Sequence, residues 1–320
     1  MEMKAMKKHF YYWLCGLIGV LGAFVLFFPN QTVAQTPPLE IKIATGNEVG
    51  TYYAIGEDLE ELGKQNNLDI DIIPTRGSLQ NIHNVSQYES VPLGITQSDI
   101  LAFLNIFGND DEAIQQGAKA MSIVSPLYQE EVHLIARREI NSIQELDGKR
   151  VSVGEPESGT SLTAVTLLYD FGVNPGDVLS LESKQGINAL RDGRIDALFY
   201  VIGAPARVLE EEISTADNLH LLPLNSPTQS QIQSFSILYE PVTLPANTYS
   251  WQPEPVETLA VESVLFTMAG QDCEKVTPVA QMIKDNLSWL QENGEAVWQK
   301  VTLEESPLLA GERRSSCAVL

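Results

Sequence analysis

Two segments that lie far apart in the chain share one design: a β-strand, then a turn with Gly and hydroxyl residues, then an amphipathic helix. In the first, strand 40–44 leads into the turn 45–50 and a helix that begins near Thr51. In the second, strand 150–153 leads into the turn 154–158 and another helix. The first N–H groups of a helix have no partner inside it, and this end carries a partial positive charge. Two such ends facing each other across a cleft can hold a small anion or zwitterion, which is typical of a two-lobed binding protein.

The N-terminal region predicts export. Lysines precede an apolar stretch over residues 11–28, and small residues follow at Thr32, Val33 and Ala34. This order predicts a secretory signal peptide over residues 1–34, removed after Ala34, and places the mature chain in the periplasm or elsewhere outside the cytoplasm. The alternative is an uncleaved membrane anchor, because the apolar stretch is almost long enough to span a bilayer.

The charge of the chain narrows its partners. The formal net charge is −22, and the leader carries Lys4, Lys7 and Lys8 against Glu2, so its removal would leave −24. Such an acidic surface repels nucleic acid, whose binding requires clustered Lys and Arg. We interpret the acidity mainly as a source of solubility.

The cysteines suggest a disulfide rather than a metal site. Removal of the leader leaves Cys273 and Cys317, which in an oxidising compartment can form one bond between the C-terminal tail and a preceding helix. Neither has a Cys or His neighbour at ligand spacing, so we expect no metal.

Strands and helices alternate along the whole mature chain, which indicates an α/β fold. We expect two doubly wound domains. Lobe one would comprise residues 35–138 and 235–320, and lobe two would be inserted as residues 139–234. Two connecting segments would form a hinge, and the ligand would lie in the cleft at the carboxyl ends of the strands.

Several segments resemble, in order, the motifs of the TAXI family of TRAP-transporter solute receptors. The family's strand followed by T-G-G-x-G-G-x-Y-Y corresponds here to Thr45-Gly46-Asn47-Glu48-Val49-Gly50-Thr51-Tyr52-Tyr53. The other matching segments are Thr75–Asn81 (T-G-G-S-x-x-N), Gln97–Asp99 (Q-S-D), Leu127–His133 (L-Y-x-E-x-V-H), Leu146–Thr160 (L-x-G-K-R-V-S-V-G-x-P-G-S-G-T), Leu190–Ala197 (L-x-D-G-x-I-D-A) and Pro245–Tyr249 (P-A-x-T-Y).

The resemblance implies a two-lobed fold of the type 2 periplasmic-binding-protein kind and a function in transport. Members of the family capture small solutes outside the cytoplasm and deliver them to a membrane permease driven by an ion gradient. We therefore expect a monomeric receptor for a small carboxylate-bearing solute, such as an amino acid like glutamate or glutamine. The alternatives are a dicarboxylate such as 2-oxoglutarate as ligand, or a ligand-sensing module for a membrane signalling partner. An enzyme is disfavoured because neither a G-x-S-x-G elbow nor a His-x-x-x-His zinc motif is present, and no cofactor is expected.

The resemblance and the turns together nominate a set of ligand-binding residues. Tyr52 and Tyr128 would wall the pocket with their rings. A ligand carboxylate would meet the backbone and hydroxyls at the start of the second helix, although ordinary N-capping is the alternative role for that segment. The full set is Gly46, Asn47, Thr51, Tyr52, Arg76, Ser78, Gln97, Tyr128, Ser158, Gly159, Thr160, Ser161 and Gly203.

For three further residues, two tyrosines and one histidine, we predict a place in the core or at the cleft. Tyr53 is expected in the core, because one of two adjacent residues at a helix start faces inward. His133 lies within an apolar strand and is expected to be a core histidine. Tyr200, at the end of a strand, is expected to face the cleft.

The departures from the family pattern bear on the ligand. Arg76 and Glu157 both replace a Gly of the pattern. Arg76 can clamp a ligand carboxylate, pair with Glu48 or Glu157 at the rim, or face water. If both of these glutamates line the pocket, an amine on the ligand is favoured over a second carboxylate, and hence an amino acid over a plain dicarboxylate.

Overall fold

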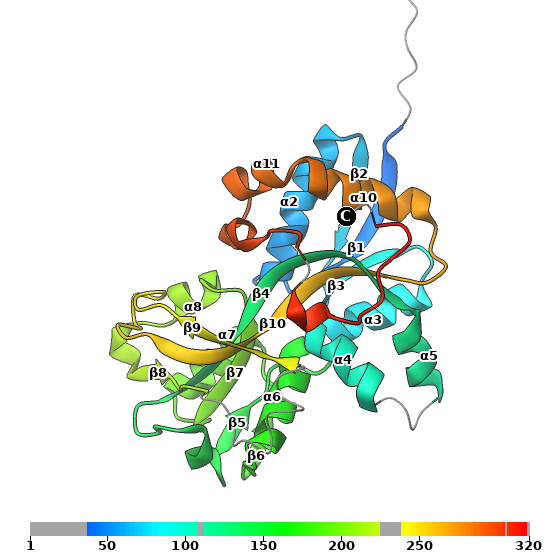
Figure 1. Ribbon diagram of the computed structural model, residues 1–320. Helices are drawn as coiled ribbons and strands as arrows, with labels where there is room; N and C mark the ends of the chain where they lie inside the picture. Colours follow the sequence, from blue (N-terminus) through cyan, green and yellow to red (C-terminus); the bar gives the residue numbers. More distant parts are fainter. Residues whose placement is uncertain (1–36, 108–111, 225–237, 305, 319–320) are drawn as a thin grey trace, which may run out of the picture. The chain divides into compact units, whose positions relative to one another are not determined.

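The computed structural model describes residues 37–107, 112–224, 238–304 and 306–318 (Figure 1). Residues 38–320 form one compact unit. The predicted signal peptide, residues 1–34, lies outside the described residues. Among the helices that are described, none is both long enough and apolar enough to cross a membrane.

A ten-stranded mixed sheet with the order β2-β1-β3-β10-β4-β7-β5-β6 organises the fold, with β8 added beside β4 and β9 beside β10. The strands are β1 (Leu39–Ala44), β2 (Leu68–Ile73), β3 (Leu93–Gln97), β4 (Met121–Arg137), β5 (Arg150–Ser152), β6 (Asp177–Leu179), β7 (Ala197–Ile202), β8 (Leu219–Leu221), β9 (Glu240–Leu244) and β10 (Val256–Met268).

Helices connect the strands and cover the sheet. The α-helices are α2 (Thr51–Gln65), α3 (Ser78–Gln87), α4 (Ser98–Phe107), α5 (Glu112–Ala120), α6 (Gly159–Asp170), α7 (Ser183–Arg191), α8 (Arg207–Glu212), α10 (Cys273–Asp285) and α11 (Leu287–Asn293). The 3₁₀ helices are η2 (Ile143–Leu146), η3 (Thr215–Asp217), η4 (Ala296–Lys300) and η5 (Pro307–Leu309).

Each end of the sheet is parallel, and the middle is antiparallel. Strand β1 pairs in parallel with β2 and β3, and β5 pairs in parallel with β6 and β7. Each of these pairs is joined through a helix, as parallel strands require a crossover. This is the expected arrangement of two doubly wound halves, and the predicted α/β fold class is confirmed.

Two long antiparallel strands, β4 and β10, run side by side through the centre and belong to both halves (Figure 1). Strand β10 pairs with β3 on one side, and β4 pairs with β7 from Glu131 onward. The pairing of β4 with β10 shifts register between Glu262 and Val264. An irregular ladder at this point bends the strands where they pass from one half to the other.

The apolar cores follow the two halves. One cluster packs α2, α10 and η4 against β1 and β3, with Trp298 fully buried in it. Two further clusters gather residues of β5, β7, α6, α7 and α8. Tyr239 and Trp251 belong to these latter clusters. The lobe bounds 35–138, 235–320 and 139–234 stay a prediction.

Two stretches differ from the secondary structure that the apolar pattern predicts. The expected strand near 132–136 is only the end of β4, whose 17 residues are almost all buried. The apolar spacing over 279–297 predicts one helix, but the structure divides it at Asn286, whose side-chain amide donates to the carbonyl of Met282 at 2.9 Å. A side chain that bonds back to the preceding turn competes with the helical ladder and ends the helix there.

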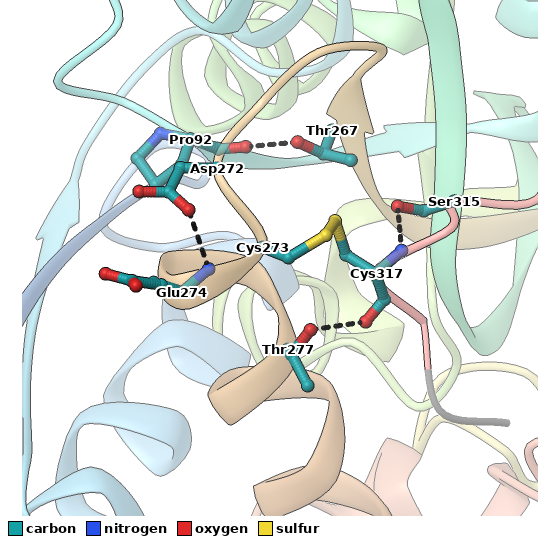
Figure 2. The surroundings of a disulfide bond; sticks show 8 residues. All are labelled: Pro92, Thr267, Asp272, Cys273, Glu274, Thr277, Ser315 and Cys317. Carbon is teal, nitrogen blue, oxygen red and sulfur yellow. Dashed lines mark hydrogen bonds between the residues drawn. A yellow bond between two sulfur atoms is a disulfide. The ribbon is translucent and has the colours of Figure 1, made fainter.

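The predicted disulfide between Cys273 and Cys317 is present, with the two Cα atoms 5.1 Å apart (Figure 2). It joins the start of α10 to the C-terminal tail. Thr277 Oγ1 donates to the Cys317 carbonyl at 2.9 Å, and Ser315 Oγ accepts from the Cys317 N–H at 3.1 Å. The Thr277 bond holds the tail against α10 beside the disulfide, and the Ser315 bond lies within the tail.

Removal of this disulfide should destabilise the protein. The two cysteines are 44 residues apart, and closing a loop of this length in the unfolded chain contributes about 4 kcal/mol in the chain-entropy treatment. Urea unfolding of the Cys273→Ser/Cys317→Ser variant should show a lower free energy of unfolding. The wild type under reducing agent should match the variant. Equal stability of the oxidised wild type and the variant would contradict the proposed contribution of the disulfide.

Candidate ligand-binding site

The N-termini of α2, α3 and α6 meet at one cavity of about 80 Å³. It lies at the carboxyl ends of β1, β3 and β7 and beside the middle of β4. The residues that line it are Gly46, Asn47, Gly50, Thr51, Tyr52, Arg76, Gly77, Ser78, Gln97, Tyr128, Glu130, Gly154, Glu155, Ser158, Gly159, Thr160, Leu181, Ser183, Leu198, Phe199, Tyr200, Val201 and Ile202.

The structure brings together every residue of the nominated set at this cavity except Ser161 and Gly203. Ser161 lies further along the first turn of α6 and bonds to Ser158 through both its N–H and its hydroxyl. Gly203 packs against Tyr128 and Val297, and a Cβ there would lie 2.8 Å from an atom of each. Gly203 therefore permits close packing behind the cavity.

The start of α6 is both capped and turned toward the cavity. Ser158 Oγ accepts from the Ser161 N–H at 3.1 Å and donates to the Glu155 carbonyl at 2.7 Å. Gly159 and Thr160, the two residues before Ser161, line the cavity. Thr160 Oγ1 accepts from the Val201 N–H at 3.1 Å, which fixes α6 against β7.

Gly159 marks the tightest approach at the site. A Cβ at this position would lie 1.8 Å from Gln97 Oε1 and 2.8 Å from Ser78 Oγ. A larger residue here would have to displace the side chains of Gln97 and Ser78. The absence of a side chain at Gly159 thus lets the start of α6 lie directly against two polar side chains of the cavity.

Glu130 on β4 is a candidate site residue that the sequence did not nominate. Its side chain is 3% exposed and lines the cavity. Tyr52 donates its hydroxyl to Glu130 Oε1 at 2.6 Å, and Gln97 Nε2 donates to Oε2 at 3.1 Å. Burial raises the pKa of Glu130 to about 8, although these two hydrogen bonds lower it. The sequence signal was an acidic residue within an otherwise buried strand, which is rare without a partner or a function.

Gln97 carries a second feature that points to a ligand. Its side chain is 2% exposed, and its Oε1 has no hydrogen-bond partner within the described residues. A buried acceptor without a donor is costly unless something outside the protein supplies one. Asn47 Oδ1, also in the cavity wall, is likewise buried and without a partner in this part of the chain.

Arg76 pairs with Glu157 rather than standing free. Arg76 Nη1 lies 2.7 Å from Glu157 Oε2, and both side chains are about half exposed. The Glu157 carbonyl also accepts from the N–H groups of Leu79 and Gln80 at the start of α3, at 3.1 and 3.2 Å. Of the alternatives for Arg76, the structure shows the rim ion pair.

The carboxylates of the cavity differ from those that the sequence reasoning considered. Glu130 and Glu155 line it, whereas Glu48 lines an outer groove together with Glu182. Burial raises the pKa of Glu155, and the charge of Glu182 adds to this while Arg76 opposes it.

Of the predictions for Tyr200, His133 and Tyr53, the first two agree with the structure and the third is wrong. Tyr200 lines the cavity. His133 is fully buried, with Nδ1 2.8 Å from the Glu131 carbonyl and Nε2 2.7 Å from the Tyr249 hydroxyl, and burial lowers its pKa to about 4. Tyr53 is only partly buried, because Tyr52 occupies the inward-facing position at the start of α2.

Replacement of Gly159 by Ala should destabilise the protein, because the new methyl group overlaps Gln97. Overpacking of this kind costs about 1–3 kcal/mol. Gly117→Ala is the matched control, since a Cβ there meets nothing within 4 Å. Thermal unfolding should show a lower midpoint for Gly159→Ala than for Gly117→Ala. Equal midpoints would mean that the helix start does not lie against Gln97.

Several solved structures have a similar fold. MatC from Rhodopseudomonas palustris with bound malate matches with a TM-score of 0.55 and 13% identity, over 86% of this chain and 95% of that one. The structure of a periplasmic transporter matches with a TM-score of 0.54 and 11% identity, over 85% of this chain and 91% of that one. The periplasmic binding protein BugD matches with a TM-score of 0.52 and 10% identity, over 80% of this chain and 85% of that one.

These likenesses show that the chain has the two-lobed fold of periplasmic binding proteins. The candidate site lies at the carboxyl ends of strands, where open α/β sheets hold ligands. Two of these matched structures are named as periplasmic proteins, one a binding protein and the other a transporter. Residues 43–311 match the NMT1-like family, and the chain belongs to that family.

Proposed function

We propose that this protein is an extracytoplasmic receptor that captures a small amino acid of the glutamate or glutamine kind and delivers it to a TRAP-type permease. The observation that carries the proposal is a small cavity with helix N-termini on its wall and a buried carboxyl group, Glu130, inside it. The two features offer opposite electrostatic environments within one site.

The helix end at α6 is suited to the ligand's carboxylate. The N–H groups of Gly159 and Thr160 and the partial charge of a helix of 12 residues favour an anion at this point. The cavity of about 80 Å³ is far below the volume that drug-sized ligands occupy. The ligand is therefore a small solute, not a nucleotide or a peptide.

Glu130 is suited to the ligand's amine. An ammonium group beside it would form a charge-assisted hydrogen bond and favour the ionised carboxylate. The unpartnered Gln97 Oε1 offers a second acceptor for the same group or for a neighbouring donor. The preference for an amine follows from Glu130 instead of from Glu48 and Glu157, on which the sequence argument relied.

A dicarboxylate is the second candidate, and two observations favour it. MatC, which has the same fold, is described with bound malate. Burial also raises the pKa of Glu130, and a protonated carboxyl group can donate a hydrogen bond to a ligand carboxylate. The two candidates thus require opposite protonation states of one residue.

The transport partner and the compartment follow from the sequence motifs. The TAXI-like segments support a TRAP permease as partner, and the predicted leader supports delivery from the periplasm. We propose that β4 and β10 act as the hinge, because they connect the two halves and their ladder is irregular between Glu262 and Val264. A sensing module would use the same cavity and differ only in its membrane partner.

Thermal unfolding against a panel of amino acids and organic acids tests the proposal. A ligand that binds only the folded chain stabilises it by about 2.7 kcal/mol at a hundredfold excess over Kd. Glutamate, glutamine or a close relative should raise the midpoint. No shift with any member of the panel, together with no small molecule released on denaturation by mass spectrometry, would contradict the receptor function.

A further inference from the structure

We infer that the cavity selects an amino acid with no net charge, whose side chain ends in a neutral donor, over the anionic amino acid of the same shape. The inference rests on the proposed function, since it assigns the class of solute to the same site. It follows from the charged side chains around the cavity and from the bonds that Glu157 makes with Arg76 and with the start of α3.

The only basic residue that lines the cavity or its outer groove, among the described residues, is Arg76. Its guanidinium already lies 2.7 Å from Glu157 Oε2. A second carboxylate on the ligand would have to displace Glu157 to gain this partner. Because the ion pair is half exposed to water, Arg76 adds little net positive potential to the cavity.

The start of α3 is also occupied. The N–H groups of Leu79 and Gln80 donate to the Glu157 carbonyl. Glu157 has a φ of +66°, which turns its backbone toward α3. One residue thus neutralises the nearest cation through its side chain and caps the nearest helix through its backbone. Neither the Arg76 guanidinium nor the N–H groups of Leu79 and Gln80 remain for a second ligand carboxylate.

Apart from Arg76, the side chains around the site that can carry a charge near neutral pH are carboxyl groups. Glu130 and Glu155 line the cavity, and Glu48 and Glu182 line the outer groove. An amino acid zwitterion matches this balance, because α6 receives its carboxylate and Glu130 receives its ammonium. An additional negative charge would lie near these four carboxyl groups, with no basic side chain among the described lining residues left to pair with it.

An unpartnered acceptor indicates what the ligand's side chain should offer. Asn47 Oδ1 is buried without a hydrogen-bond partner in the described part of the chain, beside the start of α2. A carboxylate oxygen there would face another acceptor, whereas an amide N–H₂ would donate to it. Glutamine and glutamate have the same shape and differ in this group alone, so they form the test pair.

The test is isothermal titration calorimetry of the purified wild type with glutamine and with glutamate at pH 7. Wild type should bind glutamine at least about tenfold more tightly, because a site that bonds a neutral donor rejects a like-sized group that leaves its acceptor unpaired. Glu157→Gln frees Arg76 and should reduce the glutamine-to-glutamate preference by about tenfold or more, mainly through tighter glutamate binding.

Glu139→Gln is the matched control, because it also removes one half-exposed glutamate from an ion pair, with Arg137 at 2.6 Å, away from the cavity. It should keep the wild-type preference. The double variant Arg76→Gln/Glu157→Gln should return the preference toward the wild-type value, which separates the freed guanidinium from the mere loss of a negative charge.

The outcomes distinguish this inference from the function on which it rests. Wild type that binds glutamate as tightly as glutamine, or binds only dicarboxylates, overturns the inference and leaves a solute receptor. A preference that changes equally in Glu139→Gln and Glu157→Gln also overturns it. Wild type that binds no amino acid and no organic acid overturns the receptor function and the inference with it.

Discussion

The close approach of the α6 N-terminus to Gln97 at Gly159 is the constraint on which the site depends. The two groups belong to opposite halves of the sheet, and only a residue without a side chain lets them meet. Thr163 Oγ1, one turn further along α6, donates to the buried Asp99 at 2.6 Å and continues the same contact. The long, paired strands β4 and β10 hold both halves in one sheet and so bring the two sides of this contact together. A single glycine therefore decides how narrowly the cavity closes around a solute.

The electrostatic character of the cavity arises from burial rather than from basic side chains. In a chain with a formal net charge of −22, the groups suited to an anion are helix N–H groups, which need no countercharge nearby. Glu130 lies in the same cavity, and burial raises its pKa to about 8. Arg76, the basic residue at the mouth, is held by Glu157. The site thus combines a weak anion-binding end with a single acidic group, which is the balance that a zwitterion requires.

Much of the architecture and most of the cavity wall could be predicted from the sequence, because strand–turn–helix segments place their turns at one edge of a sheet. Tyr52, Ser78 and Gly159 are found at the cavity for this reason. Glu130 was missed because it lies inside a buried strand, where periodicity gives no sign of which face a polar residue takes. The partner of Arg76 stayed open because Glu157 is 81 residues away and pairs only once the halves are folded together. The TAXI-like motifs bear on the permease partner, which the fold alone does not identify.

The measurement that tests the account most directly is the Kd of the bound amino acid as a function of pH, from about pH 6 to about pH 7.5, below the titration of the ligand's own amine. Glu130 has a pKa of about 8 without a ligand, and pairing with an ammonium requires its ionised form, so binding must release its proton. The account predicts that affinity rises as the pH rises through this range, and that Glu130→Gln removes the rise. Affinity that falls with rising pH would show a protonated Glu130 donating to the ligand and would contradict the account.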